Sequence, residues 1–280
     1  MVSNDSDVPT FMKVGSGNES DKNALPDLIS TYHQNINIET KYVADSSFFA
    51  ADNLHQIKEL SWISRVPMTI KKATEIIVKV SKAAQWINSE QSGYQYREQN
   101  VNYHGIEQRW LVVESEKRKK SDLLKLEKNI KKEKEKIELQ KKKWKKNKRK
   151  NKEEIQVEIK QLKKRIKYHQ ISNTKYIEVS NKRKKQEEIK YSCEIEYSQN
   201  REAIELGEIK AGKFILATNI LEKEELSSSQ MLKAYKNQQG CERGFRFIKD
   251  PLFLASHVYV KNAKRVEVMG VIMGCIPPWN

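Results

Sequence analysis

The sequence predicts a layered α/β domain that is interrupted by a long basic insertion. Outside residues 117–190, short apolar segments rich in β-branched residues alternate with segments of helical periodicity, which is the order of a layered α/β domain. Residues 117–190 hold 30 of the 53 Lys and Arg residues but 11 of the 37 Asp and Glu residues, a net charge of +19 against −3 for the rest of the chain. We therefore expect a nearly neutral body with one strongly cationic insertion.

The elements before the insertion follow from short motifs. "TFMKV" predicts a short strand and "GSGN" a turn, followed by a helix over residues 19–34 that Asn18 could cap. "KYVAD" predicts a second strand, and the following residues predict a helix near 50–59, a strand at "SWISRV" and a helix around 70–81. The glycines of "VGSGNESD" match no nucleotide-binding spacing, so we interpret them as a strand-to-helix turn.

Within the insertion, apolar residues recur at helical spacing. A first seam with a period of seven residues is followed by a second seam after "KKNKRKNK", which predicts a mobile antiparallel helical hairpin and not a stable coiled coil. "QRWLVVES" before the hairpin and "EIKYSCEIEY" after it predict strands, and "KFILATN" predicts a buried strand further on. The seam residues are Leu123, Ile130, Ile137 and Trp144, then Ile155, Ile159, Leu162 and Ile166.

The charge of the insertion indicates a polyanionic partner, DNA or RNA, bound in a salt-dependent way. The alternative is a solvated lysine-rich hairpin with no particular partner. No apolar run approaches the ~20 residues that cross a bilayer, and "MVSNDSDVPT" lacks the layout of a signal peptide, so we expect a cytoplasmic protein without a membrane partner. The three cysteines and five histidines are scattered, which predicts neither a disulfide framework nor a zinc site.

Residues 234–250 form a predicted helix with one polar face. On a wheel of roughly 100° per residue, this face centres on Glu242 and lies opposite two glycines and Phe247. Because missing side chains allow close packing, we expect Gly240 and Gly244 to lie against a sheet and the polar face to point away from it. The alternative is an ordinary amphipathic helix with a solvated basic face. The residues within about 40° of Glu242 are Tyr235, Gln238, Arg246 and Lys249.

Asp45 ends the apolar strand "KYVAD", where a carboxylate can be presented at the edge of a sheet. A strand-end Asp combined with a helix-borne Glu242 is typical of a metal site, because such hard oxygen ligands hold Mg²⁺ or Mn²⁺. Two such ions roughly 3.5–4 Å apart can activate water in phosphodiester cleavage. The sequence therefore predicts a metal-dependent nuclease site.

At these residues the chain resembles the DDE transposases of bacterial insertion sequences, in particular the insertion-sequence-four group. Its signature is Tyr, two residues, Arg, three residues, Glu, six residues, Lys. Tyr235, Gln238, Glu242 and Lys249 match that spacing, with Gln in place of Arg. The segments "VADSSFF", "WISRVP", "QRWLVVES", "KFILATN" and "ERGFRFIKDPLFLASHVYVKNAKRVE" also resemble a branch of the group. The resemblance extends along most of the chain and is weakest in the insertion.

The resemblance implies a ribonuclease-H-like fold with a largely β insertion before the glutamate helix, and metal-dependent cleavage and joining of DNA at transposon ends. Asp45 would be the second acidic residue of the triad and Glu242 the third, both as Mg²⁺ or Mn²⁺ ligands. Lys249 and Tyr235 would hold phosphates near the cut. Gln238 and Arg246 would be either DNA contacts or helix-surface residues. Trp62, Trp110 and Trp144 could stack on a base, but core or seam packing is the better interpretation.

The resemblance also implies truncation at both ends. The first acidic residue lies upstream in the family, and Asp5 and Asp7 are interpreted as parts of a surface turn. A basic tail would be missing after "IPPWN", whose prolines end any helix. We expect an incomplete ribonuclease-H-like domain, inactive alone, in residues 1–90 and 213–280, with an insertion subdomain over 91–212. The expected partners are transposon and target DNA, with a homodimer to be tested. The alternative is a non-enzymatic nucleic-acid-binding protein that uses the basic hairpin.

Overall fold

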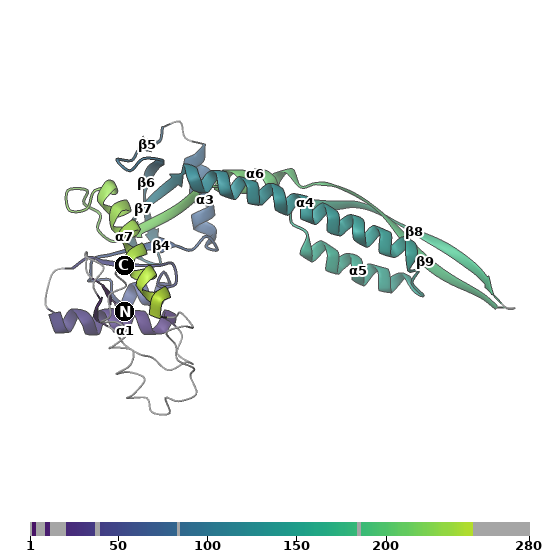
Figure 1. The fold of residues 1–280 in the computed structure, drawn as a ribbon, viewed down its shortest axis with the longest axis horizontal. Helices are drawn as coiled ribbons and strands as arrows, with labels where there is room; N and C mark the ends of the chain where they lie inside the picture. Colours follow the sequence, from purple (N-terminus) through teal and green to yellow (C-terminus); the bar gives the residue numbers. More distant parts are fainter. Residues whose placement is uncertain are drawn as a thin grey trace, which may run out of the picture. The chain divides into compact units, whose positions relative to one another are not determined.

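The computed structural model describes residues 2–3, 9–11, 21–36, 40–82, 85–183 and 186–248. These residues form two compact units, and helices and strands occur in both, so the predicted α/β class is confirmed (Figure 1). Unit 1 contains the described residues of Met1–Ile76, Ala83–Glu114 and Phe214–Asn280, and unit 2 contains those of Ile77–Lys82 and Ser115–Lys213.

Unit 1 is built on a six-stranded mixed sheet. Its strand order is β3-β4-β10-β7-β6-β5, so β10 lies between two strands that precede it in the sequence. β3 runs parallel to β4, whereas β10 runs antiparallel to β4. A central strand of the sheet therefore comes from the part of the chain that follows unit 2. The strands are β3 (Tyr42–Ala44), β4 (Trp62–Val66), β5 (Ile87–Asn88), β6 (Tyr94–Tyr103), β7 (Ile106–Ser115) and β10 (Lys213–Thr218).

A two-residue turn joins β6 to β7. Its residues, His104 and Gly105, have φ values of 52° and 80°. Positive φ at both central positions is the geometry that matches the twist of two antiparallel strands. The turn thus fixes which residues of β6 and β7 lie opposite each other.

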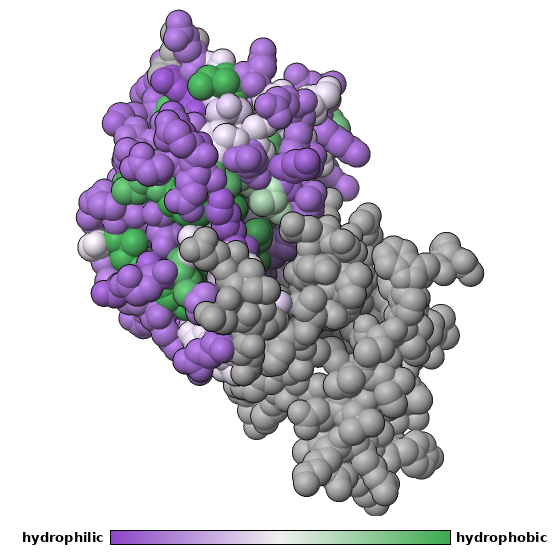
Figure 2. Space-filling model, turned by 90° about the vertical axis from the view of Figure 1, so that its left-hand side faces the viewer, coloured by the Kyte–Doolittle hydropathy of each residue, from purple (hydrophilic) through white to green (hydrophobic). Residues whose placement is uncertain are grey.

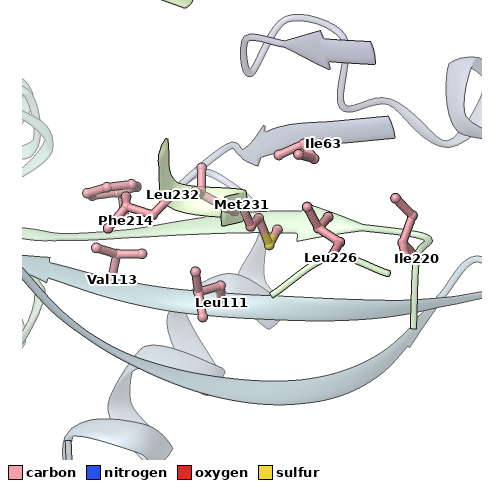
Figure 3. Packing of buried hydrophobic residues seen from close by; sticks show 9 residues of the cluster. Ile63, Leu111, Val113, Phe214, Ile220, Leu226, Met231 and Leu232 are labelled. Atoms are coloured by element: carbon pink, nitrogen blue, oxygen red, sulfur yellow. The ribbon is translucent and has the colours of Figure 1, made fainter. Parts of the chain in front are cut away.

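The two faces of the sheet bury different side chains. Along β7, Trp110 and Leu111 are both fully buried although they are adjacent, because successive strand residues point to opposite faces. One face carries an aromatic cluster in which the Phe49 and Trp110 ring centroids lie 6.0 Å apart. The other face carries an aliphatic cluster (Figure 3). This cluster contains one aromatic ring, that of Phe214, and its other residues are Ile63, Leu111, Val113, Leu216, Ile220, Leu226, Met231 and Leu232.

The helices of unit 1 agree with most of the predicted ranges. The predicted helices over 19–34, 50–59 and 70–81 correspond to α1, α2 and α3, and the helix predicted around Glu242 corresponds to α7. The first two residues of the strand predicted at "TFMKV" belong to β2, and its other three residues lie outside the described part of the chain. The predicted cap Asn18 and the residues Asp5 and Asp7 lie outside the described part of the chain. The bounds are α1 (Asp21–Ile36), α2 (Ala51–Gln56), α3 (Lys71–Ser81) and α7 (Ser228–Ile248), with β1 (Val2–Ser3) and β2 (Pro9–Phe11) paired separately.

Unit 2 consists of a long two-stranded ribbon with helices packed on it. The strands of the ribbon are antiparallel along their whole length, and both α4 and α5 contact both of them (Figure 1). Ser115 begins α4 by accepting a hydrogen bond from the Arg118 backbone N–H, and α6 packs against α4. The elements are α4 (Glu116–Lys146), α5 (Lys152–Arg165), β8 (His169–Arg183), β9 (Gln186–Gln199) and α6 (Arg201–Lys210).

The seam residues of the insertion belong to a core that two helices alone do not form. Ile137 and Ile155 from the two predicted seams are buried together with Cys193 and Ile195 of β9. The two predicted helices are present as α4 and α5, and their seams pack against β9 as well as against each other. The strands supply the apolar surface that one apolar residue per heptad leaves missing. Burial raises the pKa of the Cys193 thiol to about 11.

The described surface has little apolar character. Figure 2 shows one face of the molecule on which hydrophilic residues dominate and hydrophobic residues form small separate groups among them. Among the described residues, none of the helices combines the length and the apolar composition that crossing a membrane requires.

Candidate active site

Asp45 lies directly after β3 and is exposed. Its Oδ1 accepts hydrogen bonds from the Ser47 backbone N–H at 2.8 Å and from the Ser47 hydroxyl at 2.5 Å. The Asp45 carbonyl accepts a third bond, from the Ser64 hydroxyl of the neighbouring strand, at 2.9 Å. These bonds close a turn at the strand end and fix the direction of the carboxylate. The prediction that "KYVAD" presents Asp45 at the end of a strand is confirmed.

The face of α7 that carries position 242 is set by its N-terminal half. Met231 and Tyr235 precede Glu242 by eleven and seven residues, so they share one helix face with it. Met231 is buried in the aliphatic cluster, and the Tyr235 ring packs 6.1 Å from the Phe214 ring of β10. This face is therefore turned toward the sheet in the described half of the helix.

The exposed side of the described half of α7 lies in line with the two glycines. Lys233 and Asn237 are exposed, and Gly240 and Gly244 follow each of them by seven residues on the same face. The expectation that Gly240 and Gly244 pack against the sheet stays a prediction, because these two residues lie beyond the part of α7 whose side chains the structure describes. The large apolar residues Met231 and Leu232 decide which side is buried, because each contributes area that a glycine cannot.

α7 packs against β3 and β4. Leu232 and Met231 join the cluster that includes Ile63 of β4, and Val43 of β3 packs against the same cluster (Figure 3). Asp45 directly follows strand β3, so the helix that carries position 242 lies over the strand that presents the candidate acid. The two parts of the predicted site, which are far apart in sequence, thus belong to adjacent elements of unit 1.

A polar cluster that the sequence did not predict holds the start of α7. The Glu98 carboxylate of β6 accepts a hydrogen bond from the Ser228 hydroxyl at the first residue of α7 and pairs with Lys223 at 2.6 Å. The buried Arg109 of β7 donates a hydrogen bond to the Leu226 carbonyl in the same loop. A carboxylate beside a helix N-terminus is also favoured by the helix dipole. In the polar sequence "REQNVNY" no spacing distinguishes Glu98 from its neighbours, so sequence reasoning had no signal for it.

The Glu98 carboxyl is electrostatically stabilised in its charged form. Burial raises its pKa, but hydrogen bonds from Lys223 and Ser228 and the charges of Lys223 and Arg109 outweigh burial. The pKa of Glu98 therefore lies below its ordinary value, and the carboxylate remains ionised at neutral pH.

The other predicted site residues divide between described and undescribed positions. Tyr235 and Gln238 are both partly buried on α7. Glu242 and Arg246 lie within the backbone of α7, but their side chains are outside the described part of the structure, as is Lys249 altogether. Trp62, Trp110 and Trp144 are fully buried, which confirms core packing and excludes base stacking.

The described residues can be compared with the ligand sets that metal ions need. No set of three or more His, Cys, Asp or Glu side chains in the described part of the chain is placed to hold a metal ion. The Asp45 carboxylate offers hard oxygen, the donor type that suits Mg²⁺. Both of its hydrogen bonds use Oδ1, and no described residue bonds to Oδ2.

Comparison with known proteins identifies the class. The chain matches the family described as "Transposase DDE domain" over residues 1–276. The chain therefore belongs to the DDE transposase family, whose members act on DNA and generally use divalent metals. The mixed sheet and the seven helices formed by the described residues are consistent with the ribonuclease-H-like fold that the resemblance implies. No curated protein and no solved structure matches the chain.

Proposed function

We propose that the chain is a transposase of the insertion-sequence-four group that cleaves DNA and transfers strands at transposon ends. The observation that carries the proposal is the packing of α7, which contains Glu242, on the strand that Asp45 directly follows. Membership of the DDE transposase family supports the same reaction class. Asp45 and Glu242 are the second and third acids of the triad in this proposal.

Asp45 and Glu242 would hold Mg²⁺ or Mn²⁺. When bound, the metal supplies Lewis acidity that lowers the pKa of the attacking water or 3′-hydroxyl and stabilises charge at the phosphate. Ser47 keeps Asp45 in one orientation by holding Oδ1, and Oδ2 would be the oxygen left for the ion. The contacts of Glu98 with Ser228 and Lys223 set the start of α7 and thereby the position of residue 242 along the sheet.

Four further residues would contact the DNA. Lys249 acts as a point charge on a phosphate, and the Tyr235 hydroxyl donates to a second phosphate. Gln238 replaces the Arg of the family signature, so a neutral amide takes the place of a bidentate cation. Arg246 lies one turn beyond Glu242 and would contact the DNA on the same side of the helix.

Several finer statements stay predictions. They are the match to the Tyr-Arg-Glu-Lys signature and a homodimeric assembly on transposon and target DNA. The division into catalytic segments 1–90 and 213–280 and an insertion subdomain 91–212 also stays a prediction, as does a cytoplasmic location.

A cleavage assay tests the proposal. The chain is incubated with a duplex carrying the element ends and with Mg²⁺. We expect nicking that depends on the metal and disappears in Glu242→Ala but not in Glu59→Ala, a control at an exposed glutamate of unit 1. Nicking that persists in Glu242→Ala would show that this residue is not a metal ligand.

A second candidate function is non-enzymatic binding of nucleic acid through the basic hairpin. The net charge of +19 in residues 117–190 favours it. It predicts that binding is unchanged in Glu242→Ala and collapses when residues 117–190 are deleted. Unchanged affinity and an unchanged salt dependence after the deletion would eliminate it.

A further inference from the structure

The packing of α4 in unit 2 decides which of its sides solvent can reach. Leu126, Glu133, Ile137 and Trp144 recur at intervals of seven, four and seven residues and are the buried residues of the helix. The last three of them lie on the side where α4 contacts β8 and β9. Because one helix face is committed to the ribbon, the remaining charged residues are divided between two exposed sectors.

In one exposed sector of α4, all charged residues are lysines. On a wheel of roughly 100° per residue, six lysines fall within a band about 80° wide, centred about 120° from the buried face. Every one of them is exposed, and Leu139 is the apolar residue among them. No acidic residue lies inside this band between Lys125 and Lys146, although Glu135 borders it. This band is called the basic stripe, and its lysines are Lys125, Lys128, Lys132, Lys136, Lys143 and Lys146.

Three acids of unit 2, Glu133, Glu138 and Glu158, are engaged by partners that lie outside the basic stripe. Glu133 points inward and accepts the backbone N–H groups of Lys167 and Tyr168 at 2.9 and 2.8 Å. Glu158 accepts the Trp144 indole N–H and pairs with Arg149 at 2.7 Å.

Glu138 follows the same pattern from the second exposed sector of α4. Its carboxylate accepts the Tyr197 hydroxyl at 2.7 Å and pairs with Lys141 at 3.3 Å. These three carboxylates therefore bind groups within unit 2 itself.

We propose that the basic stripe of α4 binds the phosphate backbone of duplex DNA. The choice of DNA as the polyanion rests on the proposed function. α4 has 31 residues and so spans about 46 Å, compared with about 34 Å for one turn of duplex. Lysines that recur every three or four residues present a row of point charges along that length, which suits contact with phosphates without reading of sequence.

The composition of the stripe argues against a membrane as its partner. An interfacial helix needs a broad apolar face opposite its cations, but the side of α4 opposite the ribbon holds Leu124 and Leu139 as its large exposed apolar residues. The core side is occupied by the ribbon.

The test is the salt dependence of DNA binding by the full chain in EDTA, with a duplex of about 30 base pairs of arbitrary sequence. The first variant carries Lys125→Gln, Lys128→Gln, Lys132→Gln and Lys136→Gln. Each lost phosphate contact removes about 0.9 from the slope of log K against log salt concentration, so we expect the slope to fall by about 3–4. Glutamine has a helix propensity close to that of lysine, and circular dichroism checks that α4 is retained.

The matched control removes four lysines from the other exposed sector of the same helix, where Glu127 and Glu138 are interspersed. These substitutions are Lys120→Gln, Lys131→Gln, Lys134→Gln and Lys142→Gln, and all four lysines are exposed. We expect a slope change of less than about 1. A variant with arginine at the four stripe positions should keep the slope of the unmodified chain, because the charge is kept.

Three results would overturn the proposal. An equal loss of slope in both glutamine variants would show that the whole positive charge of the helix attracts DNA, without a defined binding stripe. An unchanged slope in both variants would show that the DNA binds elsewhere. Tighter binding of an RNA duplex that depends on the stripe, with DNA binding unaffected, would assign the surface to RNA. Since EDTA removes any metal, none of these outcomes depends on whether Asp45 and Glu242 form a cleavage site.

Discussion

Glu98 connects the sheet to α7, the helix that carries Glu242. Its carboxylate bonds to Ser228 and pairs with Lys223, and both bonds hold the segment that leads into α7. Charge-assisted hydrogen bonds of a partly buried carboxylate contribute about 1.5–3 kcal/mol. We expect Glu98→Gln to lower the free energy of unfolding by about that amount at pH 7, measured by urea denaturation.

The pH dependence of this contribution follows from the direction of the pKa shift. The pKa of Glu98 is lower in the folded chain than in the unfolded chain, so the unfolded chain binds the proton more tightly. The stabilisation is fully present above the unfolded pKa of about 4.3 and is lost as the pH falls through the folded pKa. The difference between the unmodified chain and Glu98→Gln should therefore shrink below about pH 4. A difference that is constant from pH 7 to pH 3 would contradict this assignment.

Trp144 is the largest side chain in the core of unit 2. It is fully buried, and its indole N–H donates to Glu158. Truncation of a buried aromatic residue costs about 3–5 kcal/mol, so we expect Trp144→Ala to unfold unit 2 at a markedly lower temperature. Leu139→Ala on the exposed side of the same helix is the control and should have little effect. Circular dichroism measures the unfolding temperature of both variants. A similar decrease in both would show that α4 is not anchored through Trp144.

At the scale of elements, Gly212 controls how β10 leaves unit 2. Its φ is 74°, and a Cβ built there would lie 2.6 Å from the Lys119 Cβ and 2.8 Å from the Lys119 backbone. The same glycine donates its N–H to Asp122 and accepts the Ser115 N–H. The first turn of α4 and the start of β10 are thus in direct backbone contact, which only a residue without a side chain permits.

Gly212→Ala should therefore cost about 2–4 kcal/mol, as the sum of left-handed strain and steric overlap. Gly105→Ala is a matched control, because Gly105 has a φ of 80° and no atom within 4 Å of the added Cβ. The control should show the strain alone, about 1–2 kcal/mol. Equal destabilisation of the two variants in denaturant unfolding would show that the close approach to Lys119 does not matter.

Most elements of unit 1 could be predicted because apolar residues mark them. "KYVAD", "SWISRV", "QRWLVVES" and "KFILATN" are strands as expected. β6 and β8 were missed, because "YQYREQNVNY" and "HQISNTKYIEVSNKR" contain few apolar residues and no sustained alternation. Each of them is stabilised by pairing with a neighbouring strand, and such pairing is not encoded locally.

The candidate site could be predicted only in part. The position of Asp45 follows from the apolar strand before it, whereas the orientation of α7 does not follow from its own sequence. A helical wheel shows which residues share a face but not which face is buried. In the described half of α7 the choice is made by Met231, Leu232 and Tyr235 against the sheet.

At the scale of the whole molecule, charge and fold divide the chain in the same way. The segment with a net charge of +19 lies within unit 2, which has its own core, and the rest of the chain is nearly neutral. A unit with its own core can present lysines on a fixed helix face, which a solvated linker cannot. In the two proposals, general attraction to DNA belongs to unit 2 and the cleavage chemistry belongs to unit 1.

The most direct test of the central claim is Mn²⁺ binding to the chain in the presence of duplex DNA, followed by electron paramagnetic resonance of the free ion. If Asp45 and Glu242 hold the metal together, Asp45→Asn and Glu242→Gln should each weaken binding by about tenfold or more, while the exposed Asp52→Asn control should not. Mn²⁺ affinity that is the same in all four proteins would contradict a shared metal site at these two residues.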